Sequence, residues 1–128
     1  ENHWELVFLE SKRNTWVSRI VHDGWKELID MWAVSWEDII LKTVKVVYID
    51  DYLNHHKIGF NDVKLIKIDV EGNEFAVLKG MKTLLSQNKN LKLIVEITDW
   101  WEEIISYMNN LSYWYKKLSE TYFVFHSK

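Results

Sequence analysis

The sequence predicts an α/β domain in which parallel strands alternate with crossover helices. Residues 63–70 and 91–97 are rich in Val, Leu and Ile, and the second run is almost continuously apolar, as in strands covered on both faces. An apolar stripe at helical spacing lies between the two runs, and another follows the second run. Because parallel strands need such crossovers, this order of elements favours the α/β class.

Two short runs of β-forming residues open the chain. Residues 3–9 and 16–21 are separated by a polar segment, which predicts an N-terminal β-hairpin. Residues 25–41 carry apolar side chains at helical spacing, so we expect a helix there, although no cap residue marks its start. Residues 43–49 predict a strand that leads into a helical turn ending near His56.

The strand at residues 63–70 is followed at once by Gly72, which suits an abrupt turn with positive φ. We expect a helix over residues 73–87, with Gly80 allowing close packing of this helix on the sheet. The apolar stripe of this helix comprises Val77, Leu78, Met81, Leu84 and Leu85.

The last third of the chain predicts a strand, a helix and a hairpin. After the strand at residues 91–97, Asp99 and Glu102 have the spacing of a capping box. The helical stripe that follows comprises Trp101, Ile104, Ile105, Met108 and Leu111. Residues 113–115 and 122–125 then predict an antiparallel hairpin.

Composition limits the classes of function. With 128 residues, 48% of them hydrophobic and 27% charged, the chain fits one globular domain spanning residues 1–128. Acids and bases are interspersed at a net charge of −3, which argues against a nucleic-acid partner. No apolar run approaches the roughly 20 residues of a membrane span. Cysteine is absent, which excludes disulfides and allows a reducing compartment, so we expect a cytoplasmic protein.

Three blocks of sequence resemble one enzyme family. The central block reads Leu-Ile-Lys-Ile-Asp-Val-Glu-Gly-Asn-Glu over residues 65–74, with Val-Leu-Lys-Gly at 77–80. Residues 44–53 and 93–97 flank it in the same order along the chain. Together they resemble the C-terminal part of FkbM-type S-adenosylmethionine-dependent methyltransferases. The resemblance implies a partial Rossmann-like methyltransferase sheet with a C-terminal antiparallel hairpin.

In that family an N-terminal half with a glycine-rich turn holds most of the methyl donor, S-adenosylmethionine. The glycines of this sequence are Gly24, Gly59, Gly72 and Gly80, which are too far apart to form such a turn. We therefore expect residues 1–128 to be the C-terminal portion without the cofactor-binding half, and we name no cofactor-binding residue. The strand at residues 63–70 would then expose an apolar edge, which predicts homo-oligomers or a rearranged N-terminal region.

The central block supplies the candidate catalytic residues. Lys67 and Asp69 point to one face of their strand, and Glu71 lies just beyond its carboxyl end, where ligands bind in open α/β sheets. Methyl transfer to a hydroxyl needs an aligned acceptor and a place for its proton. Asp69 or Glu71 could take the proton, and Lys67 could hold the acceptor or tune the carboxylates. A structural ion pair with a helix N-terminal carboxylate is the alternative.

Glu96 and Trp100 are the candidate substrate-binding residues, because both lie near the end of the neighbouring strand. Trp100 could stack on a sugar ring or another flat acceptor. Two or three acids at this edge could bind a divalent metal, but a carboxylate satisfied by backbone donors is simpler, and we predict no metal ligand. Asp51 and His55 have a spacing that can share a metal, yet two ligands do not define a site.

The sequence therefore favours a methyltransferase that acts on a hydroxyl of a sugar, a lipid-linked glycan or a small metabolite. An interaction module that keeps the scaffold without catalysis is an alternative from another class. A metal-dependent hydrolase that uses Asp69, Glu71 and Glu96 is a third possibility.

Overall fold

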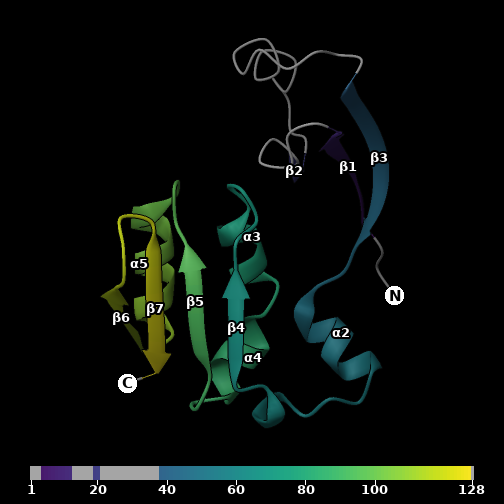
Figure 1. Cartoon of the computed structure of the whole chain (residues 1–128). Helices are drawn as coiled ribbons and strands as arrows, with labels where there is room; N and C mark the ends of the chain where they lie inside the picture. Colours follow the sequence, from purple (N-terminus) through teal and green to yellow (C-terminus); the bar gives the residue numbers. More distant parts are fainter. Residues whose placement is uncertain (1–3, 13–18, 21–37, 128) are drawn as a thin grey trace. The chain divides into compact units, whose positions relative to one another are not determined.

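The structure is a computed structural model that describes residues 4–12, 19–20 and 38–127 (Figure 1). The chain divides into two compact units, Glu1–Val46 and Val47–Lys128, and each is described by itself. In the described part of the chain, no helix has the length and apolar character needed to cross a membrane.

The first unit contains a small antiparallel sheet. Its strands are β1 (Trp4–Ser11), β2 (Arg19–Ile20) and β3 (Ile39–Val46), in the order β2-β1-β3. Phe8 of β1 lies opposite Ile20 of β2, which confirms the predicted N-terminal hairpin.

Strand β3 corrects two expectations. The strand predicted at residues 43–49 in fact runs from Ile39 to Val46. The helix predicted over residues 25–41 is wrong at its end, because residues 39–41 belong to β3, while residues 21–37 lie outside the described part. The two isoleucines that begin β3 pair antiparallel with β1, and β-branched side chains pack well in such pairs.

The second unit combines a sheet with several helices. Its elements are α2 (Ile49–His55), η3 (Phe60–Asp62), β4 (Leu65–Ile68), α3 (Glu74–Lys79), α4 (Lys82–Gln87), β5 (Lys92–Glu96), α5 (Trp101–Asn110), β6 (Tyr113–Lys117) and β7 (Tyr122–Ser127). The strand order is β4-β5-β7-β6, in which β4 and β5 are parallel and β7 is antiparallel to both of its neighbours. The α/β class and the terminal hairpin are therefore confirmed.

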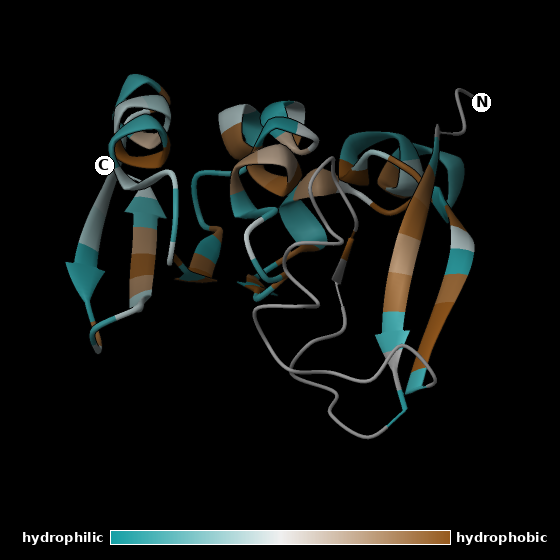
Figure 2. Cartoon of the chain, turned by 90° about the horizontal axis from the view of Figure 1, so that it is seen from above, coloured by the Kyte–Doolittle hydropathy of each residue, from teal (hydrophilic) through white to brown (hydrophobic). Residues whose placement is uncertain are grey.

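One face of this sheet packs on α3, α4 and α5, which lie on the same side of the strands (Figure 2). Side chains alternate along β5, so that Leu93 and Val95 are fully buried while Ile94 and Glu96 point to the other face. The predicted helical stripes supply much of the core: Leu78, Met81, Leu84, Leu85, Ile104 and Met108 are almost completely inaccessible.

The helix predicted over residues 73–87 is interrupted. It ends at Lys79 and restarts at Lys82, and Asp50 of α2 contacts the break. The Asp50 amide donates to the Gly80 carbonyl (3.2 Å), and its carboxylate accepts hydrogen bonds from the amides of Thr83 (2.7 Å) and Leu84 (3.0 Å). Asp50 thus caps the second helix from another element.

Gly80 is buried at this break, and a Cβ there would lie 3.0 Å from Cδ1 of Tyr48. The close packing expected of Gly80 is therefore present, but Tyr48 is its partner.

The capping box predicted from Asp99 and Glu102 is wrong. Trp100 is the N-cap residue of α5, with φ of 61°, and no side chain forms the cap hydrogen bond. A left-handed conformation is uncommon for a bulky residue and is often found beside functional sites.

Asn88 connects the end of α4 with the loop before β4. It is fully buried, and its amide nitrogen donates to the carbonyls of Phe60 (2.7 Å) and Val63 (2.6 Å). Its side-chain oxygen accepts from the Asn90 amide (3.0 Å). The loop's polar backbone is therefore satisfied inside the protein.

Candidate functional site

The turn after β4 places Glu71 beyond the carboxyl end of the strand. Glu71 and Gly72 both have positive φ, 52° and 93°, so the glycine is required where the sequence predicted it. Glu74, only 1% exposed, accepts hydrogen bonds through Oε1 from the amides of Val70 (3.1 Å) and Gly72 (3.2 Å). Glu74 therefore fixes the backbone that carries Glu71.

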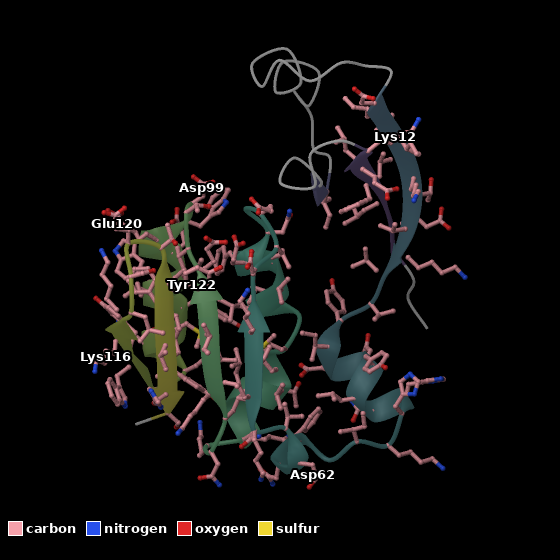
Figure 3. The ribbon with its side chains drawn as sticks, in the orientation of Figure 1. Lys12, Asp62, Asp99, Lys116, Glu120 and Tyr122 are labelled. Carbon is pink, nitrogen blue, oxygen red and sulfur yellow. The ribbon has the colours of Figure 1, made fainter. Side chains whose placement is uncertain are left out.

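The pairing of β5 with β7 brings two more residues, Thr121 and Tyr122, to the same edge. Glu96 ends β5 and lies directly opposite Tyr122, the first residue of β7. Figure 3 shows Tyr122 and Asp99 at the end of the sheet where β4 and β5 finish. The Thr121 hydroxyl donates to Oε1 of Glu96 at 3.2 Å. The antiparallel insertion of β7 thus brings hydroxyl groups beside the end of β5.

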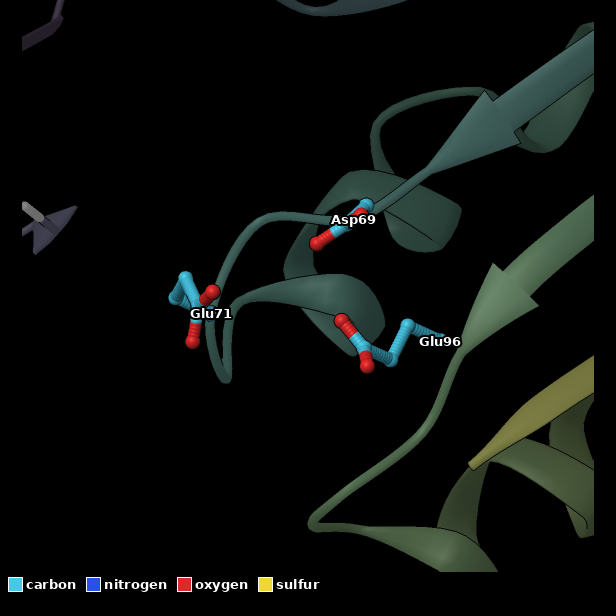
Figure 4. A group of neighbouring side chains, drawn as sticks. All are labelled: Asp69, Glu71 and Glu96. Atoms are coloured by element: carbon cyan, nitrogen blue, oxygen red, sulfur yellow. The ribbon is translucent and has the colours of Figure 1, made fainter. Parts of the chain in front are cut away.

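Three carboxylates meet at this edge. Asp69, Glu71 and Glu96 each contribute an oxygen, and these oxygens lie within 4.8 Å of one another (Figure 4). They come from the end of β4, the following turn and the end of β5. Like charges this close favour retention of a proton by one member of the group.

Asp69 is stabilised as an anion by two hydrogen-bond donors. Its Oδ2 accepts hydrogen bonds from the Lys67 ammonium (2.6 Å) and from the Tyr122 hydroxyl (2.9 Å). These bonds, that from Lys67 first, lower the pKa of Asp69 below its usual value. The same contact with Asp69 raises the pKa of both donors. Asp69 is therefore a weak base.

Glu96 has the opposite electrostatics. Partial burial raises its pKa, and the hydrogen bond and negative charge of Asp69 raise it further, with a smaller contribution from Glu71. The bond from Thr121 acts in the other direction. Of the two coupled carboxyl groups, Glu96 is the stronger base.

The structure brings together four of the five candidate residues, Lys67, Asp69, Glu71 and Glu96. The fifth, Trp100, lies in the turn before α5 with 55% of its surface exposed. Their roles in catalysis and binding remain predictions.

Sequence reasoning missed Tyr122, Thr121 and Glu74. Nothing local in the sequence indicates that Tyr122 and Thr121 reach this edge, because the contact depends on β7 lying beside β5. Glu74 carried a weak signal, since an acid in the first turn of a helix often bonds backbone amides.

The three carboxylates are close enough to surround a cation, but exposed acids commonly cluster without one. Two hydrogen-bond donors of the protein already occupy Oδ2 of Asp69. In this cluster Asp69 and Glu96 accept hydrogen bonds from neighbouring side chains of the protein. Asp51 and His55, the weaker metal candidates, are exposed on α2.

Comparison with known proteins gives one match. The sequence matches the family described as the methyltransferase FkbM domain over residues 23–115, which is well over half of the chain and includes the four clustered candidates. No curated protein and no solved structure matches the chain.

Proposed function

Because this chain belongs to the methyltransferase FkbM domain family, we propose that it transfers a methyl group from S-adenosylmethionine to a hydroxyl group. The observation that carries the proposal is the cluster of Lys67, Asp69 and Glu96 at the carboxyl ends of two parallel strands. That edge is where open α/β sheets bind their ligands.

The cluster offers what transfer to a hydroxyl requires. An acceptor hydroxyl is a poor nucleophile until a base takes its proton, and two coupled carboxyl groups with opposite pKa shifts are suited to that task. The Lys67 ammonium could also hold an acceptor oxygen. Trp100, exposed at the next turn, offers a flat surface for a sugar ring, so we propose a sugar, a glycan or a small hydroxylated metabolite as the acceptor.

The described residues suit the cationic end of the methyl donor. Its sulfonium would supply an activated methyl group, and the described carboxylates at this edge, which outnumber the Lys67 ammonium, favour a positive charge. A glycine-rich turn would be expected to hold its nucleoside part. The described turn after β4 contains one glycine, Gly72, so we propose no residue for that role.

A binding measurement tests the donor. Isothermal calorimetry with S-adenosylmethionine is expected to show binding by this chain, or by a longer one if the natural protein continues upstream of Glu1. Binding that disappears in Asp69→Ala but survives in Asp51→Ala supports the proposed edge. If neither chain binds the donor, the second candidate function, an interaction module on a methyltransferase scaffold, is favoured.

We also propose that β4 mediates self-association. Among the strands that the structure describes, β4 pairs with β5 alone, and its Leu65 is 57% exposed. Such an edge can pair with another chain. Sedimentation velocity is expected to show concentration-dependent dimers that Leu65→Lys weakens. A chain that stays monomeric at all concentrations would contradict this proposal.

For location we propose the cytoplasm, because a chain without cysteine needs no oxidising compartment.

A further inference from the structure

Tyr122 reaches across a whole strand to contact the candidate site. It belongs to β7, which pairs with β5, yet its hydroxyl donates to Asp69 at the end of β4, at 2.9 Å. The Lys67 ammonium donates to the same carboxylate oxygen at 2.6 Å and also lies 5.5 Å from the centre of the Tyr122 ring. Two donors from different strands thus fix one carboxylate oxygen.

Glu96 lies beside this fixed anion with fewer donors of its own. Among the described residues, the Thr121 hydroxyl donates to Oε1 of Glu96 at 3.2 Å. The charged groups that face it are Asp69 and Glu71, while Lys67 and Tyr122 are engaged with Asp69. Partial burial, the hydrogen bond with Asp69 and the negative charge of Asp69 therefore make Glu96 the more basic of these two carboxylates, in agreement with the directions of their pKa shifts.

We propose that Tyr122 is a positioning residue which, with Lys67, fixes Asp69 as an anion and so leaves Glu96 to accept the proton of the acceptor hydroxyl. This inference rests on the proposed methyl transfer. In that step the acceptor oxygen forms a bond to the methyl carbon as the carbon–sulfur bond breaks. The sulfonium becomes a neutral thioether, and the hydroxyl proton moves to the Glu96 carboxylate. Asp69 keeps its charge throughout.

The positioning role can be tested without donor or acceptor, by carbon-detected NMR titration of the Asp69 and Glu96 carboxyl groups in the 128-residue chain. In the unmodified chain, Asp69 is expected to lose its proton at lower pH than Glu96. Tyr122→Phe keeps the ring but removes the hydroxyl donor, so the Asp69 midpoint should rise and the interval between the midpoints should narrow. Lys67→Gln should shift the Asp69 midpoint in the same direction.

Tyr115→Phe is the matched control, because it removes a hydroxyl from the adjacent strand β6 and should leave both midpoints in place. An Asp69 midpoint that does not move in Tyr122→Phe, in a chain whose amide spectrum stays folded, overturns the positioning role. So does a Glu96 that titrates below Asp69 in the unmodified chain.

The proton-accepting role needs a chain that transfers methyl groups. There Glu96→Gln is expected to lower kcat by about 100-fold or more and to remove the acid limb of the pH profile. An unchanged kcat overturns that role. If no chain transfers a methyl group, the proposed function is contradicted. The NMR titration tests the positioning role of Tyr122 independently of that result.

Discussion

The two ends of the β4–β5 pair satisfy their polar groups in different ways. Where the strands begin, one fully buried amide, Asn88, makes hydrogen bonds through both its nitrogen and its oxygen. Where the strands finish, three partly accessible carboxylates lie close together, and the Lys67 ammonium donates to one of them, Asp69. The first arrangement holds loops in place, whereas the second contains Asp69 and Glu96, whose pKa values are displaced in opposite directions. The sheet can tolerate like charges at one end because the hydrogen bonds of the other end supply stability.

The sharpest test of this contrast is Asn88→Ala. The substitution leaves the carbonyls of Phe60 and Val63 without their donor in a buried place, so the free energy of unfolding should fall by about 3 kcal/mol. Urea denaturation followed by circular dichroism measures it. The exposed residue Asn110, changed to Ala, is the control and should alter stability by less than about 0.5 kcal/mol. Equal losses of unfolding free energy in the two variants would contradict the structural role given to Asn88.

Glu74 is a buried acid beside the site, so Glu74→Ala should lower the free energy of unfolding by about 2 kcal/mol. The amides of Val70 and Gly72 would lose their acceptor. Glu74→Gln keeps an acceptor oxygen and should retain most of the stability. If the two variants unfold at the same denaturant concentration, the role assigned to Oε1 is incorrect.

Asp50→Ala removes the cap of α4 and should cost about 1 kcal/mol. Its neighbour Asp51 is exposed and provides the paired control, for which little change is expected. Hydrogen exchange of the Thr83 and Leu84 amides should accelerate in the first variant alone, because these amides lose their acceptor.

The smallest effect concerns pH. The folded state raises the pKa of Glu96, so its favourable contribution is complete below the unfolded-state pKa and is lost as the pH rises through the folded-state pKa. The unfolding free energy of the unmodified protein minus that of Glu96→Gln should therefore decrease as the pH rises through the mildly acidic range. Asp69 has the opposite sign, since its pKa is lowered and its contribution is lost only in stronger acid. A difference that increases with pH would refute the assignment of Glu96.

Local patterns were sufficient for much of the fold. The periodicity of residues 63–70 and 91–97 predicted two parallel strands, and their pairing explains why Asp69 and Glu96 approach each other. The helix break at Gly80 could not be predicted, because Asp50, which caps the new start, is about thirty residues away. For the same reason Tyr122 was missed: its proximity to Asp69 depends on the place of β7 in the sheet. Residues 39–41 fit a helix or a strand equally well by spacing, and their partner β1 decides between them.

The insertion of β7 also has a consequence for biosynthesis. This strand is made after β4, β5 and β6, yet it occupies an interior position between β5 and β6 (Figure 1). The growing polypeptide therefore cannot complete the sheet on the ribosome until residues 122–127 have emerged, and β5 and β6 lack their shared neighbour until then. During that interval, unpaired strand edges would be available to chaperones or to other nascent chains.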